Sequence, residues 1–320
     1  MKQLFAIGEA LIDFIPAESE KMLKDVGSFS PSVGGAPANV CGAFTRLGGK
    51  SHMITQLGAD PFGDKIVQEF ERYGIGTEHI IRTDNANTSL AFVALKADGN
   101  REFSFYRKPG ADMLYDAENI KQSWFKDLFA LHFCSVSLGR FPMKQAHRVA
   151  ITCAKKEGGL ISFDPNLRFP LWESRQELYD AVWEFLPLAH ILKISDEELL
   201  FLTGKKKIED ALPQLFVGDV KLIVYTKGAG GAVAYTKQAC AQVEGQKVKA
   251  VDTTGAGDAF IGSFLYQLAA YDVTVDNIDA LAEETLRTYL DFSNRYCACS
   301  VQKTGVIASY PTMADMIHKP

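Results

Sequence analysis

Residues 252–260, DTTGAGDAF, combine two carboxylates, two hydroxyl groups and two glycines directly before an apolar run. Phe260, Phe264 and Leu268 recur at helical spacing, which predicts a buried helix beginning near Gly255. The first N–H groups of a helix have no partners within it, and glycine and alanine leave them open to an anion. Asp258, in the first turn, could take a proton from an attacking hydroxyl group. The alternative is that Asp258 only stabilises the helix N-terminus.

A second helix start follows residues 32–39, SVGGAPAN, in which Pro37 suits a first helical position. The pair Gly34 and Gly35 would let a ligand approach the backbone. Asn39 offers a donor and an acceptor to a sugar hydroxyl group, and Asp13, at the end of the first expected strand, can accept from two. Taken in isolation, each of these residues is more often a cap or a turn residue than a ligand-binding one.

A third polar segment, residues 163–168, FDPNLR, follows an expected strand. The carboxyl ends of parallel strands face the ligand crevice, so Arg168 could bind phosphate or hydroxyl groups there, or be an ordinary surface arginine. Other phosphate motifs are incomplete. The Walker A spacing before Gly49-Lys50-Ser51 has Phe44 in place of glycine, and GxGxxG fails at Val233, which argues against P-loop and dinucleotide-binding proteins.

These segments need a scaffold of alternating strands and helices. Short apolar runs predict buried strands at 4–11, 51–58, 130–137, 159–165, 190–195, 221–228 and 231–236. Longer periodic segments predict helices at 64–74, 176–189 and 196–204, the first two ending near Gly74 and Pro187. This alternation of strands and helices along the chain indicates an α/β fold with a mostly parallel sheet covered by helices on both faces.

Two stretches of the chain do not follow this alternation of strands and helices. Residues 13–32 lack a helix of useful length, and residues 88–107 alternate apolar and polar around Asp98-Gly99-Asn100, a hairpin turn signal. We expect them to form a small β-structured lid on a core of residues 1–12, 33–87 and 108–320. Such a flap commonly covers an active site, although it could be a surface hairpin without that role.

Bulk properties exclude several classes. The net charge of −5 over 320 residues argues against a nucleic-acid-binding protein, because the chain lacks an excess of positive charge to bind the phosphates. Glu9 and Asp13 interrupt the apolar N-terminus, which argues against a signal peptide, and no apolar run has the length of a membrane span. The six cysteines form no CxxC pair, which favours reduced, buried thiols. A cytoplasmic protein without membrane or nucleic-acid partners is expected.

The two glycine-rich segments together resemble the signatures of the ribokinase-like (PfkB) sugar kinases, and the likeness covers nearly the whole chain. The resemblance implies a three-layer ribokinase-like core and transfer of the γ-phosphoryl group of ATP to a primary hydroxyl group. It makes Asp258 the general base and the backbone of Gly255, Ala256 and Gly257 the anion hole. The residues that it implies for holding the sugar are Asp13, Gly34, Gly35, Asn39, Arg107 and Arg168.

The resemblance also implies where ATP and ions bind. The nucleotide residues would be Lys193, Ser195, Thr226, Lys227, Gly228, Gly231, Asn294 and Ala298. The Asn-x-x-Glu motif that organises Mg²⁺ and its waters is matched by residues 195–198, with Glu198 in place and Ser195 replacing the asparagine. A potassium site next to the anion hole would use Asp252, Thr254, Ser300 and Gly305, with Ser309 nearby.

The flap and the segment that follows it, residues 101–114, are similar to those of fructokinases, so fructose is the expected substrate. The stretch 164–172 also occurs in 2-keto-3-deoxygluconate kinases, and that keto-acid sugar, or a sugar of another kinase in the family, is the alternative. Two other classes stay open: a non-catalytic sugar sensor on the same fold, and a nucleotide-dependent oxidoreductase. An exposed β-flap could also pair with its copy in a homodimer.

Overall fold

The computed structural model describes residues 2–18, 20–95 and 101–318. Its centre is a ten-stranded sheet with the path β14-β13-β12-β11-β10-β9-β1-β4-β5, and β6 pairs with β4. The strands are parallel except at β12-β13 and β13-β14. Their bounds are β1 Gln3–Ile7, β4 Ser51–Gly58, β5 Ile75–Gly76, β6 Ile80–Thr83, β9 Leu128–Cys134, β10 Leu160–Asp164, β11 Ile191–Ser195, β12 Leu222–Thr226, β13 Ala232–Tyr235 and β14 Cys240–Val243.

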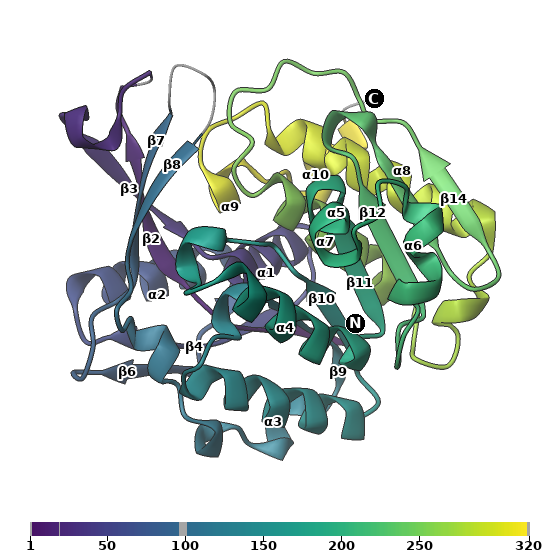
Figure 1. Ribbon diagram of the computed structural model, residues 1–320, viewed down its shortest axis with the longest axis horizontal. Helices are drawn as coiled ribbons and strands as arrows, with labels where there is room; N and C mark the ends of the chain where they lie inside the picture. Colours follow the sequence, from purple (N-terminus) through teal and green to yellow (C-terminus); the bar gives the residue numbers. More distant parts are fainter. Residues whose placement is uncertain (1, 19, 96–100, 319–320) are drawn as a thin grey trace.

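Helices cover both faces of this sheet (Figure 1). One face packs on α3 (Pro142–Lys156), α4 (Arg175–Phe185), α5 (Asp196–Thr203) and α6 (Ile208–Leu215). The other face packs on α1 (Ala36–Arg46), α2 (Pro61–Tyr73), α7 (Ala256–Ala270) and α8 (Glu283–Ser300), and the short α9 (Val306–Ser309) and α10 (Met313–His318) follow them. Phe133 and Phe163 stack between neighbouring strands in the first layer. This arrangement confirms the three-layer α/β fold.

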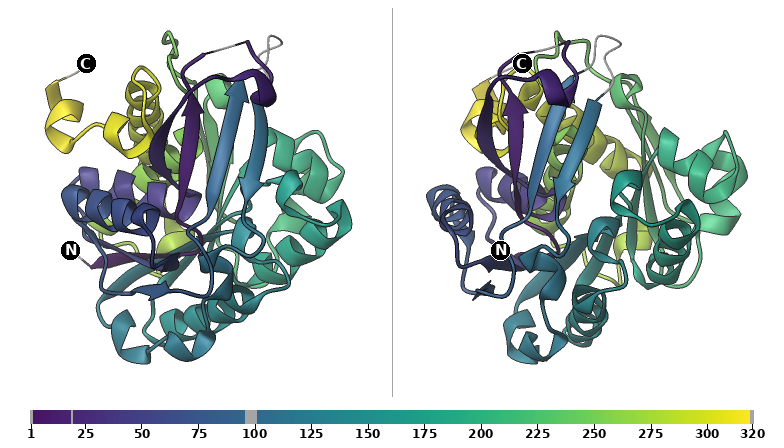
Figure 2. Two further views of the ribbon diagram at one scale, coloured as in Figure 1. Left: turned by 90° about the vertical axis from the view of Figure 1, so that its left-hand side faces the viewer. Right: turned by 60° about the vertical axis from the view of Figure 1, so that its left-hand side comes forward.

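A separate four-stranded sheet, β3-β2-β7-β8, stands beside the core (Figure 2). It consists of β2 (Leu11–Pro16), β3 (Phe29–Gly34), β7 (Leu90–Leu95) and β8 (Arg101–Tyr106). The pair β2-β7 is parallel and joins the two expected lid segments, while both hairpins are antiparallel. The expected turn at Asp98-Gly99-Asn100 lies outside the described residues.

The first expected strand, 4–11, is in fact divided between the two sheets. β1 ends at Ile7 and β2 begins at Leu11, because Gly8 takes φ 144°, a conformation that side chains disfavour. The apolar run continues through the break because residues 4–12 are all buried. Asp13 therefore lies within a lid strand and not at the end of a core strand.

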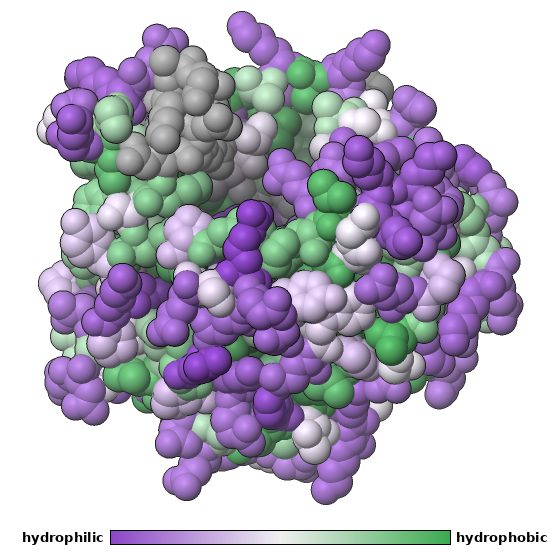
Figure 3. All heavy atoms as spheres, in the orientation of Figure 1, coloured by the Kyte–Doolittle hydropathy of each residue, from purple (hydrophilic) through white to green (hydrophobic). Residues whose placement is uncertain are grey.

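The expected burial of the cysteines is only partly correct. All six are free thiols, but only Cys41 and Cys134 are buried, while Cys240 is exposed on edge strand β14. Hydrophilic side chains predominate on the face that Figure 3 shows, with hydrophobic ones scattered between them. No helix in the described part of the chain is long and apolar enough to cross a membrane.

Candidate active site

The N-terminus of α7 is built around Gly255, which precedes the first helical residue and adopts a left-handed φ of 72°. The Tyr310 hydroxyl group donates to the Gly255 carbonyl oxygen at 2.9 Å, which fixes the turn from behind. A Cβ at position 255 would collide with Val306 and Tyr310, so glycine is required by both conformation and space. The first turn therefore sits on a rigid support, and within it Ala256 N donates to Thr253 O at 3.2 Å.

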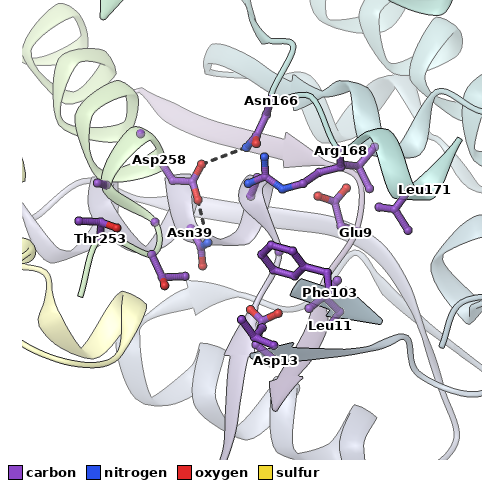
Figure 4. Close-up of a pocket in the computed structure, with 18 of the residues that line it drawn as sticks. Glu9, Leu11, Asp13, Asn39, Phe103, Asn166, Arg168, Leu171, Thr253 and Asp258 are labelled. Carbon is purple, nitrogen blue, oxygen red and sulfur yellow. Dashed lines mark hydrogen bonds between the residues drawn. The ribbon is translucent and has the colours of Figure 1, made fainter. Parts of the chain in front are cut away.

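Asp258 lies in that first turn, 6% exposed, and two amides hold its carboxylate (Figure 4). Asn39 Nδ2 donates to its Oδ2 at 2.8 Å, and Asn166 Nδ2 donates to its Oδ1 at 3.3 Å. Burial raises the pKa of Asp258, while the Asn39 hydrogen bond and the charges of Arg168 and Lys193 oppose that rise. The result is a fixed carboxylate that is more basic than an exposed aspartate, as a general base requires.

Asp258 borders a cavity of about 220 Å³ between the core and the lid. Asn39 Oδ1 is buried without a hydrogen-bond partner among the described residues, so it can accept a hydrogen bond from a ligand hydroxyl group. Phe103 and Phe105 of β8 line the cavity from the lid. Its polar wall consists of Glu9, Asp13, Asn39, Asn166, Arg168, Lys193, Thr253, Thr254 and Asp258.

Close backbone approach shapes the lid side of this cavity. Asp13 on β2 faces Ser32 on β3, and a Cβ at Gly34 would collide with the Asp13 carboxylate. Gly35 adopts φ 109°, and a Cβ there would lie 2.5 Å from the Glu9 carbonyl oxygen. The glycine pair therefore lets β3 turn into α1 directly over the sugar-sized space. Gly35 and Asp13 line the cavity, while Gly34 supports Asp13 from behind.

A second cavity, of about 580 Å³, lies on the other side of the α7 N-terminus. Seven of the eight expected nucleotide residues line it, namely Lys193, Ser195, Thr226, Gly228, Gly231, Asn294 and Ala298; the structure leaves Lys227 out of the lining. Lys193, Thr253, Ala256 and Gly257 line both cavities. Two ligands can thus meet over the first turn of α7, beside Asp258.

Lys193 projects from β11 into this junction. Its Nζ lies 3.0 Å from Asp164 Oδ2 in a buried ion pair, and a Cβ at Gly257 would lie 3.3 Å from the same Nζ. Burial opposes the charge of Lys193, but the carboxylates of Asp164 and Glu198 outweigh it and raise the pKa of the lysine. A cation is therefore held at the place where the two cavities join.

Glu198 is fixed by the helix start that contains it. Its Oε2 accepts from Ser195 N at 2.7 Å, its Oε1 accepts from Leu167 N at 3.2 Å, and Ser195 Oγ caps the Glu198 amide. This is a capping box, a role that serine fills as well as asparagine. The substitution at Ser195 therefore preserves the local geometry that holds Glu198.

Arg107 differs from its expected role of holding the sugar. Its guanidinium forms an ion pair with Asp112 and donates to Val136 O at 3.4 Å, and it does not line the cavity. Asp112 also accepts from Ser89 Oγ, and Ser137 Oγ, next to Arg107, donates to Glu9 Oε2 at 2.9 Å. Arg107 thus supports the cavity wall through Ser137 and Glu9, whereas Arg168 lines the cavity itself.

The expected monovalent-cation residues are only partly brought together. Asp252, Thr254 and Gly305 line a third cavity of about 560 Å³, next to the anion-hole turn. Ser300 Oγ donates to Cys297 O and Ser309 Oγ donates to Val306 O, and neither serine lines that cavity.

Asn166 and Glu9 are site residues beyond those expected from the sequence. Asn166 lies in the DPNLR segment with Arg168, and its place two residues after a strand end was a usable signal. Glu9 is 2% exposed in an apolar run, and burial raises its pKa to about 7. A lone acid within the apolar run of residues 4–11 was the available signal for Glu9.

The fold and the paired cavities define a three-layer α/β protein with a β-sheet lid, in which the N-terminus of α7 lies between two cavities of ligand size. The chain belongs to the pfkB family of carbohydrate kinases, because the family's model matches residues 1–313. Fructokinase-2 of Solanum lycopersicum is 41% identical over 318 residues, covering 98% of this chain and 94% of its own.

Two solved structures are also similar over nearly the whole chain. A fructokinase with bound ATP from Xylella fastidiosa has a TM-score of 0.90 at 33% identity, covering 98% of this chain and 97% of its own. A fructokinase from Vibrio cholerae O395, in a form with bound fructose, ADP and calcium ion, has a TM-score of 0.87 at 34% identity, covering 99% and 98%.

Proposed function

We propose that this protein transfers the γ-phosphoryl group of ATP to the primary hydroxyl group of fructose. The observation that carries the proposal is the position of Asp258, which borders the small cavity at the helix turn shared with the larger one. A sugar in the first cavity and ATP in the second would meet at this turn. The full-length similarity to fructokinases supports the same assignment.

In this mechanism Asp258 accepts the proton of the attacking hydroxyl group. Asn39 and Asn166 already orient both carboxylate oxygens, so the base needs little rearrangement when the sugar enters. Asn39 Oδ1, which lacks a partner among the residues described, would accept a hydrogen bond from a second sugar hydroxyl group. The lid residues Phe103 and Phe105 would exclude water from the occupied cavity.

The negative charge of the transferring group would be stabilised at the α7 N-terminus. The N–H groups of Gly255 and Gly257 are fixed before the reaction begins, which makes their stabilisation effective, and Ala256 N would join them on leaving Thr253 O. Lys193 lines both cavities and would follow the phosphoryl group from donor to acceptor. Thr226, Gly228, Asn294 and Ala298 would hold the rest of the nucleotide.

The acidic residues near this junction fit Mg²⁺, which would neutralise charge on the ATP phosphates. Both oxygens of Glu198 already accept backbone hydrogen bonds, so Glu198 would act through a water molecule and not as a direct ligand. The Asp252 cavity fits a hydrated K⁺, with Thr254 and Gly305 supplying oxygens. Ser300 and Ser309 would then act only by shaping the surrounding turns.

The charge of the cavity favours a neutral sugar over a keto-acid sugar. Three carboxyl groups, those of Glu9, Asp13 and Asp258, line it beside two cations, Arg168 and Lys193, and Lys193 already forms an ion pair with Asp164. A substrate carboxylate would therefore meet more carboxyl groups than available cations. Fructose, which carries only hydroxyl groups, suits this wall better than 2-keto-3-deoxygluconate does.

A coupled ADP-release assay over a sugar panel, with and without K⁺, tests the proposal. We expect fructose to give the highest kcat/KM, K⁺ to raise it, and 2-keto-3-deoxygluconate to react poorly. Absence of ADP release with any ketohexose would rule out the fructose assignment. Sugar binding without ADP release under the same conditions would instead support a sugar sensor.

We also propose a homodimer formed through the lid. The four-stranded sheet has β3 and β8 as its edges, and unpaired edge strands are templates for pairing with another chain. Sedimentation equilibrium measures the mass directly: a mass of one chain at micromolar concentration would exclude this dimer.

A further inference from the structure

A cluster of two histidines and a glutamate lies away from both cavities. His52 is the second residue of β4, and Glu78 and His79 form the turn between β5 and β6. One potential ligand atom from each residue lies within 4.8 Å of the other two. Since the sugar site lies at the opposite, carboxyl ends of the strands, this cluster has no part in the kinase reaction.

The backbone brings His52 and Glu78 together through Gly76. His52 pairs with Phe5 on one side and with Gly76 on the other in the parallel sheet. A Cβ at Gly76 would collide with His52 Nδ1 and would lie 2.7 Å from Glu78 Oε2. The missing side chain therefore leaves the space in which the imidazole and the carboxylate approach each other.

Aromatic rings fix both imidazoles before any ligand arrives. The His52 ring stacks on Phe5 with centroids 4.8 Å apart. The His79 ring stacks on Trp124 at 4.2 Å and on Phe5 at 5.4 Å. Because these stacks restrict both rings, a metal ion would bind with little loss of side-chain freedom.

The imidazole nitrogen atoms of this cluster are available to bind a ligand. His52 Nδ1 lies 2.5 Å from Glu78 Oε1 without the alignment of a hydrogen bond, and both ring nitrogens of His52 are buried with no hydrogen-bond partner in the described part of the chain. The Oε1 atom of Glu78 also lies 3.9 Å from His79 Nε2. Buried imidazole nitrogens without partners are uncommon and call for a ligand.

We propose that His52, Glu78 and His79 bind a first-row divalent metal ion such as Zn²⁺. Two imidazoles and one carboxylate are a known ligand set for Zn²⁺, which binds such atoms at about 2.0–2.2 Å and completes its shell with water. The Glu78 side chain is 52% exposed, so it can shift to open the space for the ion. The bound ion would join β4 to the 77–79 turn and stabilise this edge of the sheet.

The test uses full-length protein, freed of metal by a chelator, with ZnCl₂ titrated by calorimetry and CoCl₂ by visible absorption. We compare wild type with Glu78→Gln and His79→Gln, and with Glu71→Gln as a matched control at an exposed glutamate of α2. We expect one ion per chain in wild type and Glu71→Gln, a higher melting temperature with Zn²⁺, and affinity reduced roughly 10-fold or more in Glu78→Gln. His79→Gln should lose the cobalt spectrum.

Two results would overturn the proposal. One is an absence of metal binding by wild type, which would leave the cluster as an ion pair only. The other is binding that Glu78→Gln and His79→Gln both leave unchanged, which would place the ion elsewhere. Glu78 is on the surface, so its variant should fold even where His79→Gln does not, and unchanged sugar-kinase turnover verifies this.

Discussion

Asn39 Nδ2 lies 2.8 Å from Asp258 Oδ2, and this hydrogen bond joins the first turns of two helices that are 219 residues apart in the chain. Each helix start is glycine-rich, and in the proposed mechanism α1 would provide the sugar side of the site and α7 the phosphate side. We therefore expect this hydrogen bond to couple sugar binding at Asn39 to the protonation state of Asp258. It also predicts how the reaction depends on pH.

Replacing Asn39 by alanine should move the acid limb of the kcat/KM profile to higher pH. Asp258 must be ionised to act, so activity is lost as pH falls through its pKa, which burial raises above the ordinary value of 3.8. The Asn39 hydrogen bond stabilises the ionised form, so its loss should raise that pKa further. Asn85→Ala, on an exposed loop, is the control. An unchanged acid limb in Asn39→Ala would contradict this coupling.

Breaking the Lys193–Asp164 pair should destabilise the protein severely. Lys193→Met leaves a buried carboxylate without its cation, and the expected loss in the free energy of unfolding is about 3–5 kcal/mol. The double variant Lys193→Met/Asp164→Asn should lose less than the sum of the two single variants, but should stay inactive because Lys193 lines both cavities.

Urea denaturation measures these differences. Lys155→Met, in the more exposed Lys155–Asp219 pair, is the control and should change stability by at most about 1 kcal/mol. Equal losses at Lys155 and Lys193 would show that the buried pair has no special role.

Gly35→Ala should weaken both folding and sugar binding. Gly35 and Gly48 both have positive φ, at 109° and 99°, but a Cβ at Gly48 meets nothing within 4 Å. The strained backbone should therefore cost about 1–2 kcal/mol in each variant. Gly35→Ala should lose a further ~1–3 kcal/mol, because its Cβ lies 2.5 Å from the Glu9 carbonyl oxygen.

Thermal unfolding and fructose KM separate the two effects. A raised KM is expected only for Gly35→Ala, since only that residue lines the sugar cavity. Indistinguishable behaviour of the two variants would mean that the close approach at Gly35 does not shape the site.

The fold was predictable because its apolar runs and turn residues are local signals. The strands at 51–58, 159–165 and 221–228 all appear within one residue at the start and within two at the end, as β4, β10 and β12. The break at Gly8 was not predictable, since buried strands in two different sheets have the same composition. Because of that break, Asp13 lies within lid strand β2 and not at the end of a core strand.

The site was predictable where a helix start carried glycines, as at Gly35 and Gly255. The expected sugar contact of Arg107 was not predictable in the same way, because no sequence pattern around Arg107 indicates its ion pair with Asp112. Asn166 and Glu9 were missed because their roles depend on residues distant in sequence. The pairing of β2 with β7 that closes the lid is equally a long-range effect.

The general-base role of Asp258 is tested most directly by Asp258→Asn, which keeps the shape of the side chain and removes its charge. Steady-state assays with fructose and ATP should show kcat lowered by roughly 10²–10⁴-fold, with ATP binding and the melting temperature close to those of wild type. A kcat within a few-fold of wild type would contradict the role of Asp258 as the base.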